Sequence, residues 1–127
     1  MEKQLKAVER FHDAFGQENG KWQTLIERDQ FELRHKLMAE ENDEYLEACE
    51  NNDIVGIADA LGDQLYILCG TILKHGLQNV IEDIFDEIQA SNMSKLGEDG
   101  RPILRGDGKI LKGPHYFKPD LRKFIRE

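Results

Sequence analysis

The chain has few cysteines and no long apolar run, and each shortage excludes a class of protein. Its 127 residues include two cysteines, Cys49 and Cys69, which form no Cys-x-x-Cys pair. This argues against a disulfide scaffold and predicts two buried thiols in a reducing, cytoplasmic protein. No apolar stretch reaches the length that spans a bilayer, and Met1 is followed by a charged segment. We therefore expect neither a membrane partner nor a signal peptide.

Positive charge is also scarce over most of the chain. Residues 1–96 hold 9 Lys and Arg against 20 Asp and Glu, a net charge of −11. Residues 97–127 hold 8 against 5, a net charge of +3. A protein that binds a nucleic acid duplex needs a basic face, so the acidic body argues against such a partner. It fits a site that uses a cation, with a basic tail that meets an anion or docks on an acidic surface.

Hydrophobic periodicity predicts an all-α body of four helices. Their expected bounds are about residues 5–15, 29–50, 54–75 and 79–95. After Leu96 the chain is rich in Gly and Pro, and RPILR and KILK flank GDG, which predicts a β-hairpin. We therefore expect a single domain over residues 1–127, with a helical body at 1–96 and a hairpin and tail at 97–127.

The third expected helix is unusual because residues 54–73 contain no Lys, Arg or Glu. Asp59 and Asp63 are their only charged residues. A helix that is apolar nearly all round is predicted to be the innermost helix of a bundle. Its main apolar stripe is formed by Ile54, Leu61, Leu65, Leu68 and Ile72.

Four carboxylates fall where core side chains are expected. On the second helix, Glu41 lies at about 40° from Leu37, near the centre of the apolar stripe, and Glu44 follows on the same face. Asp59 and Asp63 share one face of the third helix. The break between these helices, Asn51-Asn52-Asp53, is short, so the two helices should be antiparallel neighbours. This arrangement brings the four carboxylates together.

The sequence offers no cation in register with this cluster. Arg34 points toward the apolar stripe but lies about two turns from Glu41. A divalent cation is then the simplest compensation, and ligands that are all oxygen favour Mg²⁺, with Mn²⁺ as the alternative. For Glu41 and Glu44, an exposed acidic helix margin is an equally good explanation. For Asp59 and Asp63 it is weaker, because Asp is both a poor helix former and a poor core residue.

Three motifs together resemble a known group. They are the Glu-Glu-x-x-Glu of Glu40, Glu41 and Glu44, the Asp-x-x-x-Asp in ADALGDQLYILCGT, and SNMSK. The set is similar to the MazG-like branch of the all-α nucleoside triphosphate pyrophosphohydrolases. The opening VERFHDAFG and the tail SNMSKLGEDGRPILRGDGKILKGPHYFKPDL resemble its phosphoribosyl-ATP pyrophosphohydrolase-like subgroup. The resemblance implies a four-helix bundle with a C-terminal hairpin, assembled as a homodimer or homotetramer.

The resemblance also implies a metal site. Glu41, Glu44 and Asp63 match the family's metal ligands. The wider family has Glu-x-x-Asp in the third helix, but Ala60 stands at the first of those positions here. Asp59, one residue earlier, then takes the place of that ligand, as in the subgroup's own pattern.

Other residues receive roles around this metal site. Glu40 flanks the metal cluster and is expected to orient or deprotonate the attacking water. Asn92 and Lys95 match the family's phosphate-contacting positions, and Lys95 brings a positive charge to the reaction. Tyr66 offers a ring that can stack on a base. In the basic tail, the residues expected to help cover a triphosphate are Arg101, Arg105, Lys109 and Lys112. An equal alternative is that the hairpin that carries them only holds a dimer together.

The main functional expectation is a Mg²⁺-dependent hydrolase that cleaves nucleoside triphosphates between the α- and β-phosphates. The products would be a nucleoside monophosphate and pyrophosphate. One alternative is the hydrolysis of phosphoribosyl-ATP in histidine biosynthesis, which the subgroup label suggests. Another is a catalytically silent, metal-binding helical module for regulation or assembly, which Ala60 favours.

Overall fold

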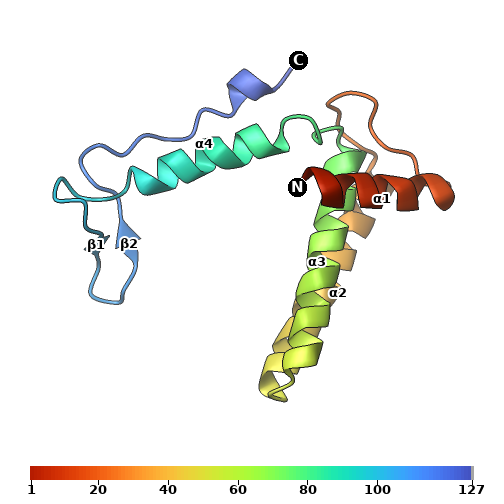
Figure 1. The fold of residues 1–127 in the computed structure, drawn as a ribbon, viewed down its shortest axis with the longest axis horizontal. Coiled ribbons are helices and arrows are strands. Elements are labelled where there is room, and N and C mark those ends of the chain that lie inside the picture. Colours follow the sequence, from red (N-terminus) through yellow and green to blue (C-terminus); the bar gives the residue numbers. More distant parts are fainter. Residues whose placement is uncertain (127) are drawn as a thin grey trace. The chain divides into compact units, whose positions relative to one another are not determined.

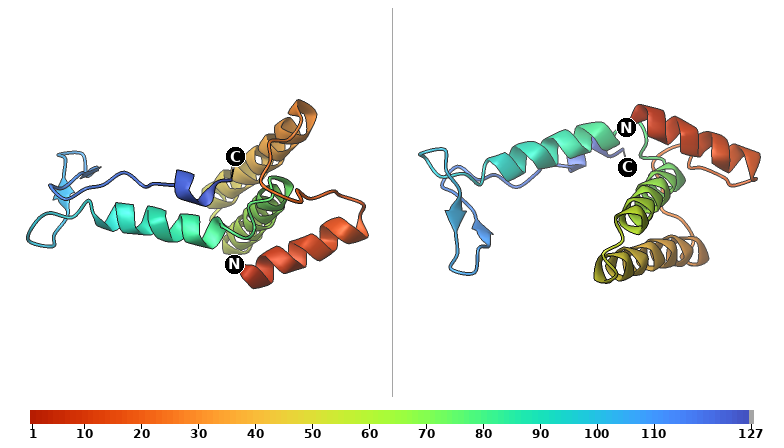
Figure 2. Two further views of the ribbon diagram at one scale, coloured as in Figure 1. Left: turned by 90° about the horizontal axis from the view of Figure 1, so that it is seen from above. Right: turned by 60° about the horizontal axis from the view of Figure 1, so that its bottom comes forward.

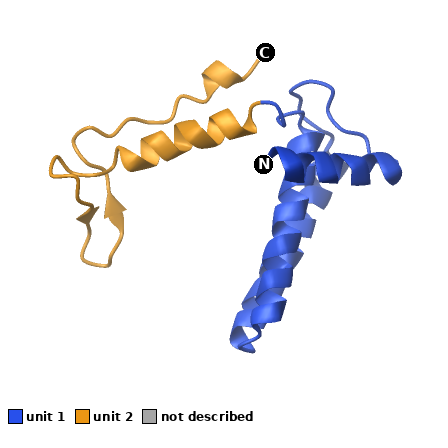
Figure 3. Cartoon of the chain, in the orientation of Figure 1, with its two compact units in different colours: residues 1–79 blue, residues 80–127 orange. Residues whose placement is uncertain are grey.

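The computed structural model describes residues 1–126, which form two compact units, Met1–Asn79 and Val80–Glu127 (Figure 3). Each unit is described by itself below. The elements are α1 (Glu2–Ala14), α2 (Arg28–Glu50), α3 (Ile54–Lys74), α4 (Ile81–Met93), β1 (Ile103–Leu104), β2 (Ile110–Leu111) and a 3-10 turn, η1 (Arg122–Phe124) (Figure 1). The predicted all-α class, the helix order and the hairpin are confirmed, while the single domain over residues 1–127 stays a prediction.

In the first unit, α2 and α3 form an antiparallel pair, and α1 crosses α3 near its C-terminal end (Figures 1 and 2). The predicted break between α2 and α3 is confirmed. Asn52 adopts a positive φ of 53°. Asp53 caps α3, because its Oδ1 atom accepts a hydrogen bond from the Gly56 N–H at 3.0 Å.

Small residues let α2 and α3 approach closely beside this turn. A Cβ atom added to Gly56 would lie 3.1 Å from the Cβ of Ala48 and 2.6 Å from the Asp53 Oδ2 atom. Ala48 is the buried residue of α2, with 8% of its surface exposed. The close approach at Ala48 and Gly56 fixes the start of the α2–α3 interface.

The core of the first unit gathers where α1 meets the C-terminal half of α3. Leu5 and Val8 of α1 are buried, as are Cys69, Ile72 and Leu73 of α3. Helices α1 and α3 contact each other along this stretch. Cys69 is buried as predicted, whereas Cys49 is only half-buried.

Helix α3 is the helix on which both α1 and α2 pack, as expected of the innermost helix, but one chain leaves most of its apolar stripe bare. Of its main apolar stripe only Ile72 is buried, with 6% exposed. Ile54, Leu61, Leu65 and Leu68 are between 41% and 73% exposed. Helices α1 and α2 cover only two sides of α3, so its remaining apolar side is bare in one chain.

The segment between α1 and α2 is bonded to the end of α3. The Gly20 N–H donates to the Leu73 carbonyl at 2.9 Å, and the Thr24 N–H donates to the His75 carbonyl at 3.0 Å. Gly76 adopts a φ of +67°, and the carbonyl of Trp22 lies directly beside its Cα. A glycine is required here both by the backbone conformation and by this contact.

The second unit is α4 with the tail running back along it. The Ser91 hydroxyl donates to the Phe117 carbonyl at 2.8 Å, and Lys123 Nζ contacts Glu87 Oε1 at 3.1 Å. In the hairpin, Ile103 pairs with Leu111 and Leu104 with Ile110 in antiparallel register. The tail after the hairpin is thus bonded to α4 at two places, and the hairpin lies in the sequence between α4 and this tail.

We predict that Gly76→Ala destabilises the protein more than Gly16→Ala. Both glycines have a positive φ, +67° and +69°, so both variants should lose about 1 kcal/mol to left-handed strain. Only at Gly76 would an added Cβ atom clash with a backbone carbonyl. This clash should add about 1–3 kcal/mol to the loss of folding stability. Urea unfolding at one protein concentration measures the difference, and equal losses would contradict this packing.

Candidate functional site

The candidate site lies on the interface between α2 and α3. Arg34, Glu41 and Ala48 follow one another at seven-residue intervals and so share one face of α2. At one end of this face Ala48 meets Gly56, and at the other end Arg34 Nη2 donates to the Ile67 carbonyl at 2.7 Å. Both ends of the face therefore contact α3, and Glu41 lies midway between these two contacts.

Glu41 is half-buried, and its Oε2 atom is fully buried without a hydrogen-bond partner. Burial raises the pKa of the Glu41 carboxyl above its ordinary value of 4.5. Glu44 raises this pKa further, as a hydrogen-bonding partner and as a like charge, and Asp63 and Asp59 add repulsion. The structure thus brings Glu44, Asp59 and Asp63 within electrostatic reach of Glu41. The expectation that all four lie in the core is wrong, because Glu44 and Asp59 are exposed and Asp63 is half-buried.

No protein cation compensates this cluster. None of the four carboxylates, which are Glu41, Glu44, Asp59 and Asp63, has an ion pair among residues 1–126. Arg34, the nearest cation expected from the sequence, is bonded to Ile67 and Thr71 instead. A buried carboxylate oxygen that lacks both a donor and a counter-charge is costly, which calls for a ligand.

A divalent cation fits this set of side chains. All four groups offer carboxylate oxygen, the donor that Mg²⁺ and Mn²⁺ prefer, and one such oxygen is buried without a partner. In the described part of the chain, no three His, Cys, Asp or Glu side chains are arranged to hold an ion. The other carboxylates are close enough to Glu41 to repel it, but the side chains do not converge on one point as the ligands of a bound ion do.

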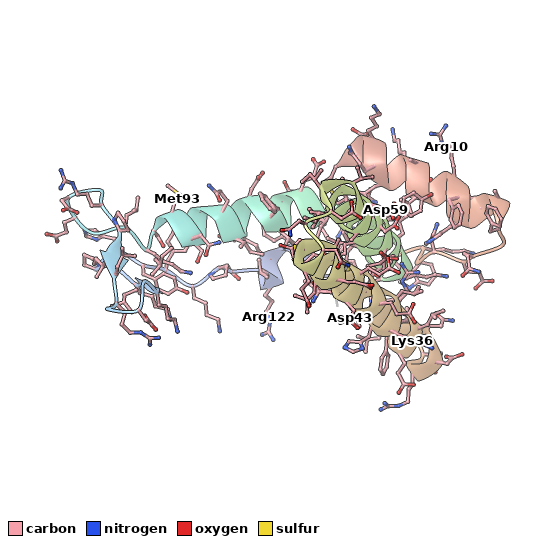
Figure 4. The ribbon with its side chains drawn as sticks, turned by 90° about the horizontal axis from the view of Figure 1, so that it is seen from below. Arg10, Lys36, Asp43, Asp59, Met93 and Arg122 are labelled. Atoms are coloured by element: carbon pink, nitrogen blue, oxygen red, sulfur yellow. The ribbon has the colours of Figure 1, made fainter. Side chains whose placement is uncertain are left out.

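Two further residues with predicted roles, Glu40 and Tyr66, lie in the same unit as the four carboxylates. Glu40 is exposed on α2 beside Glu41. Tyr66 of α3 is 43% exposed, and its ring meets the ring of Phe11 edge to face, with 5.6 Å between centroids. Figure 4 shows Asp59 on α3, whereas Asp43 lies on the side of α2 that faces away from α3.

The other predicted substrate contacts belong to the second unit. Asn92 is exposed in the last turn of α4, and its carbonyl accepts from the Lys95 N–H at 3.2 Å. Lys95 is half-buried just beyond α4. Arg101 is exposed before β1, where its N–H donates to Asp99 Oδ1 at 3.0 Å. The roles of these three residues stay predictions.

Sequence reasoning missed the part that Arg34 and His12 play. His12 is a buried polar residue, 4% exposed, and its Nδ1 atom lies 2.5 Å from Asn19 Oδ1. Both side chains contact α3 at Gly70. The seven-residue repeat of Arg34, Glu41 and Ala48 was the available signal, because it places the arginine on the face that meets α3.

The fold is similar to that of an NTP pyrophosphohydrolase. The chain is similar to a crystal structure at 1.78 Å resolution of a protein from Exiguobacterium sp. 255-15 that is proposed to be an NTP pyrophosphohydrolase. The two share 26% sequence identity and a TM-score of 0.51, over 95% of this chain and 90% of that one. The search of curated proteins found no match.

The sequence model of the phosphoribosyl-ATP pyrophosphohydrolase family (PRA-PH) matches residues 8–92, more than half of the chain. The chain belongs to this family and is a hydrolase that acts on phosphoric anhydrides. Enzymes of this kind generally use a divalent metal. Among residues 1–126, no helix has the length and apolar character needed to cross a bilayer.

We predict that Glu41→Gln stabilises the protein at pH 7.5 in the presence of chelator. The folded state raises the pKa of Glu41 above 4.5, so it binds the proton more tightly than the unfolded state does. Stability therefore falls as the pH rises above 4.5, until Glu41 is ionised in both states. Glutamine carries no charge and so avoids this loss of stability. The gain in stability from Glu41→Gln should shrink as the pH falls toward 4.5.

Thermal unfolding between pH 4 and pH 7.5 measures this effect. Glu47→Gln is the matched control, because Glu47 is exposed on the same helix. A glutamine at position 41 that gives no gain at pH 7.5, or a gain that does not change with pH, would contradict the burial of the Glu41 carboxylate.

Proposed function

We propose that this hydrolase is a Mg²⁺-dependent nucleoside triphosphate pyrophosphohydrolase. It adds water across the anhydride between the α- and β-phosphates and releases a nucleoside monophosphate and pyrophosphate. One observation carries the proposal: the buried, partnerless Oε2 atom of Glu41 lies among three further carboxylates with no protein cation. Such a cluster is suited to holding a cation against a polyphosphate.

Glu41, Glu44, Asp59 and Asp63 would hold the metal. When bound, the metal would neutralise phosphate charge and lower the pKa of a bound water. Glu40 is exposed beside this cluster, where its carboxylate can orient the attacking water and accept its proton.

Asn92, Lys95 and Arg101 supply the remaining contacts in this proposal. The amide of Asn92 donates to a phosphate oxygen, and Lys95 and Arg101 offset the charge that remains on the phosphates. Mn²⁺ is the alternative metal, because its ligand preference is similar.

Hydrolysis of phosphoribosyl-ATP is the second candidate function. The observation that favours it is the family match, because the matching family carries that activity in its name. It uses the same carboxylates and cleaves the same kind of anhydride, so the site chemistry alone does not separate the two substrates. A substrate panel separates them.

The assembly that we propose is a homodimer or a homotetramer. The bare side of α3 supports it, since Ile54, Leu61, Leu65 and Leu68 are exposed in one chain. A second copy that covered this side would bury an apolar surface that a soluble monomer rarely exposes. We expect the protein to work in the cytoplasm, where its two free cysteines would stay reduced.

We predict that Asp63→Asn abolishes metal-dependent pyrophosphate release. The panel contains the four NTPs, the dNTPs and phosphoribosyl-ATP, each with Mg²⁺ or with chelator. Asparagine keeps the shape of the side chain but removes one negative charge from the cluster, so kcat should fall by about 100-fold or more. Wild-type release should be lost in chelator.

Asp43→Asn is the matched control, because Asp43 lies on α2 away from α3 and should leave activity unchanged (Figure 4). If folded wild-type protein releases pyrophosphate from no substrate, the proposed function is wrong. Turnover of phosphoribosyl-ATP alone would select the second candidate.

We also predict that Lys95→Gln lowers kcat/KM for the best substrate by about tenfold, because it removes one charge-assisted contact to a phosphate. Lys118→Gln, an exposed position after β2, should change kcat/KM by less than about twofold. Steady-state kinetics at constant ionic strength compare the two variants. Equal effects would mean that Lys95 acts only through the net charge of the protein.

A further inference from the structure

One line of residues on α3 runs from the carboxylates to Arg34. Asp59, Asp63, Tyr66 and Gly70 recur at intervals of three or four residues, so they share one helix face. Glu41 repels Asp59 and Asp63 at one end of this line, and Arg34 contacts Gly70 at the other. Asp63 and Gly70 are seven residues apart, which is about 10 Å along the helix.

Arg34 uses only one edge of its guanidinium to hold α3. Its Nε atom donates to Thr71 Oγ1 at 3.0 Å, and Nη2 donates to the Ile67 carbonyl at 2.7 Å. A guanidinium has five N–H groups, so three remain after these two bonds. Among residues 1–126 no other acceptor contacts Arg34. The opposite edge of the fork therefore carries donors without an acceptor.

Gly70 leaves room for this guanidinium. A Cβ atom at Gly70 would lie 2.5 Å from Arg34 Nη2 and 3.1 Å from His12 Nε2. The two nitrogen atoms thus lie against the same side of α3, at the buried Gly70. Asn19 Oδ1 lies 2.5 Å from His12 Nδ1, and in the tautomer in which Nδ1 donates to this oxygen the Nε2 atom is an acceptor. A donor and an acceptor therefore lie side by side.

The charge of Arg34 is not neutralised. In the described chain no carboxylate forms an ion pair with Arg34, and burial lowers its pKa. The Arg34 charge also contributes to lowering the pKa of Lys74, after the larger effect of burial. A half-buried guanidinium with free donors and no counter-charge favours a ligand that brings an acceptor oxygen.

The space between the two ends of this line has an aromatic wall. The Tyr66 ring packs against Phe11, and both are 43% exposed. Tyr66, Gly62, Leu65 and Cys69 also line a small apolar pocket of about 120 Å³ against α1. Aromatic and apolar side chains are the usual surface for a nucleobase.

We propose that Arg34 is a specificity-determining residue that reads the nucleobase, and that the preferred substrates carry lactam bases. The inference rests on the proposed function, because the carboxylates must hold the phosphates for the base to reach Arg34. The separation of about 10 Å along α3 matches the reach of a nucleoside from its α-phosphate to the far edge of its base.

The donor and acceptor pattern selects the class of base. Guanine, hypoxanthine, uracil and thymine present a carbonyl oxygen beside a ring N–H. That edge complements the free Arg34 donors and the His12 Nε2 lone pair. Adenine and cytosine present an amino group beside a ring nitrogen, which places a donor against the guanidinium and an acceptor against the lone pair. A mismatch of this kind leaves charged and polar groups unpaired and is strongly rejected.

The test compares kcat/KM for GTP, ITP, UTP, ATP, CTP and the base-free ribose 5-triphosphate, in the full-length wild-type protein and in Arg34→Gln. We expect the wild type to prefer the lactam bases by about tenfold or more. Arg34→Gln should abolish this preference, measured in the same variant as the ratio of kcat/KM for each nucleotide to kcat/KM for ribose 5-triphosphate. Thr71→Val, which removes one bond to Arg34 but keeps the guanidinium, should retain the preference.

Each other outcome has a definite meaning. If Arg34→Gln slows every substrate equally, including ribose 5-triphosphate, Arg34 only holds α2 against α3 and the inference is wrong. A wild type that prefers ATP or CTP also overturns it. If the folded wild type hydrolyses neither the nucleotides nor ribose 5-triphosphate, the proposed function itself fails. Circular dichroism of each variant confirms that the comparison is between folded proteins.

Discussion

Uncompensated negative charge at the α2–α3 interface is the constraint on which the rest of this structure depends. Glu41 has one buried oxygen without a partner, and three carboxylates repel it. This arrangement destabilises a protein that holds no cation, because buried charge needs a counter-charge. The two helices must therefore be held together by contacts outside the carboxylate cluster. The family to which the chain belongs hydrolyses phosphoric anhydrides, a reaction for which a held cation is the main requirement.

The contacts that hold the helices lie on both sides of the cluster. At the turn, Ala48 packs on Gly56 and Asp53 caps α3. At the other end, Arg34 binds Ile67 and Thr71. These contacts fix the register of α2 on α3, and Glu41 lies midway between them on the sequence of α2. The site is thus placed by two rigid helices, which position side chains more accurately than loops do.

The sequence predicted the fold well because most of its signals are local. Helix order, the break at Asn51–Asp53 and the hairpin follow from periodicity, capping and turn residues. The exposure of Leu61 and Leu65 was not predictable in this way, because it depends on how many sides of α3 one chain covers. The proximity of the carboxylates was predictable, because Glu41 and Glu44 share one face of α2, as Asp59 and Asp63 do on α3. The contact of Arg34 with Gly70 was not, because it needs the register between two helices.

The position of Arg34 explains why one chain can hold both a cluster of carboxylates without a counter-charge and an unpaired guanidinium. An arginine one turn closer to Glu41 would reach the carboxylates, pair with them and compete with a metal. At two turns away, about 10 Å along the helix, it is beyond direct contact. The bonds to Ile67 and Thr71 keep its side chain on α3 and prevent it from folding back toward Glu41. Gly70 makes this possible, since any side chain there would displace the guanidinium. The absence of a Cβ atom at position 70 therefore separates the two charges, and it leaves the free edge of Arg34 beside the line that leads to the carboxylates.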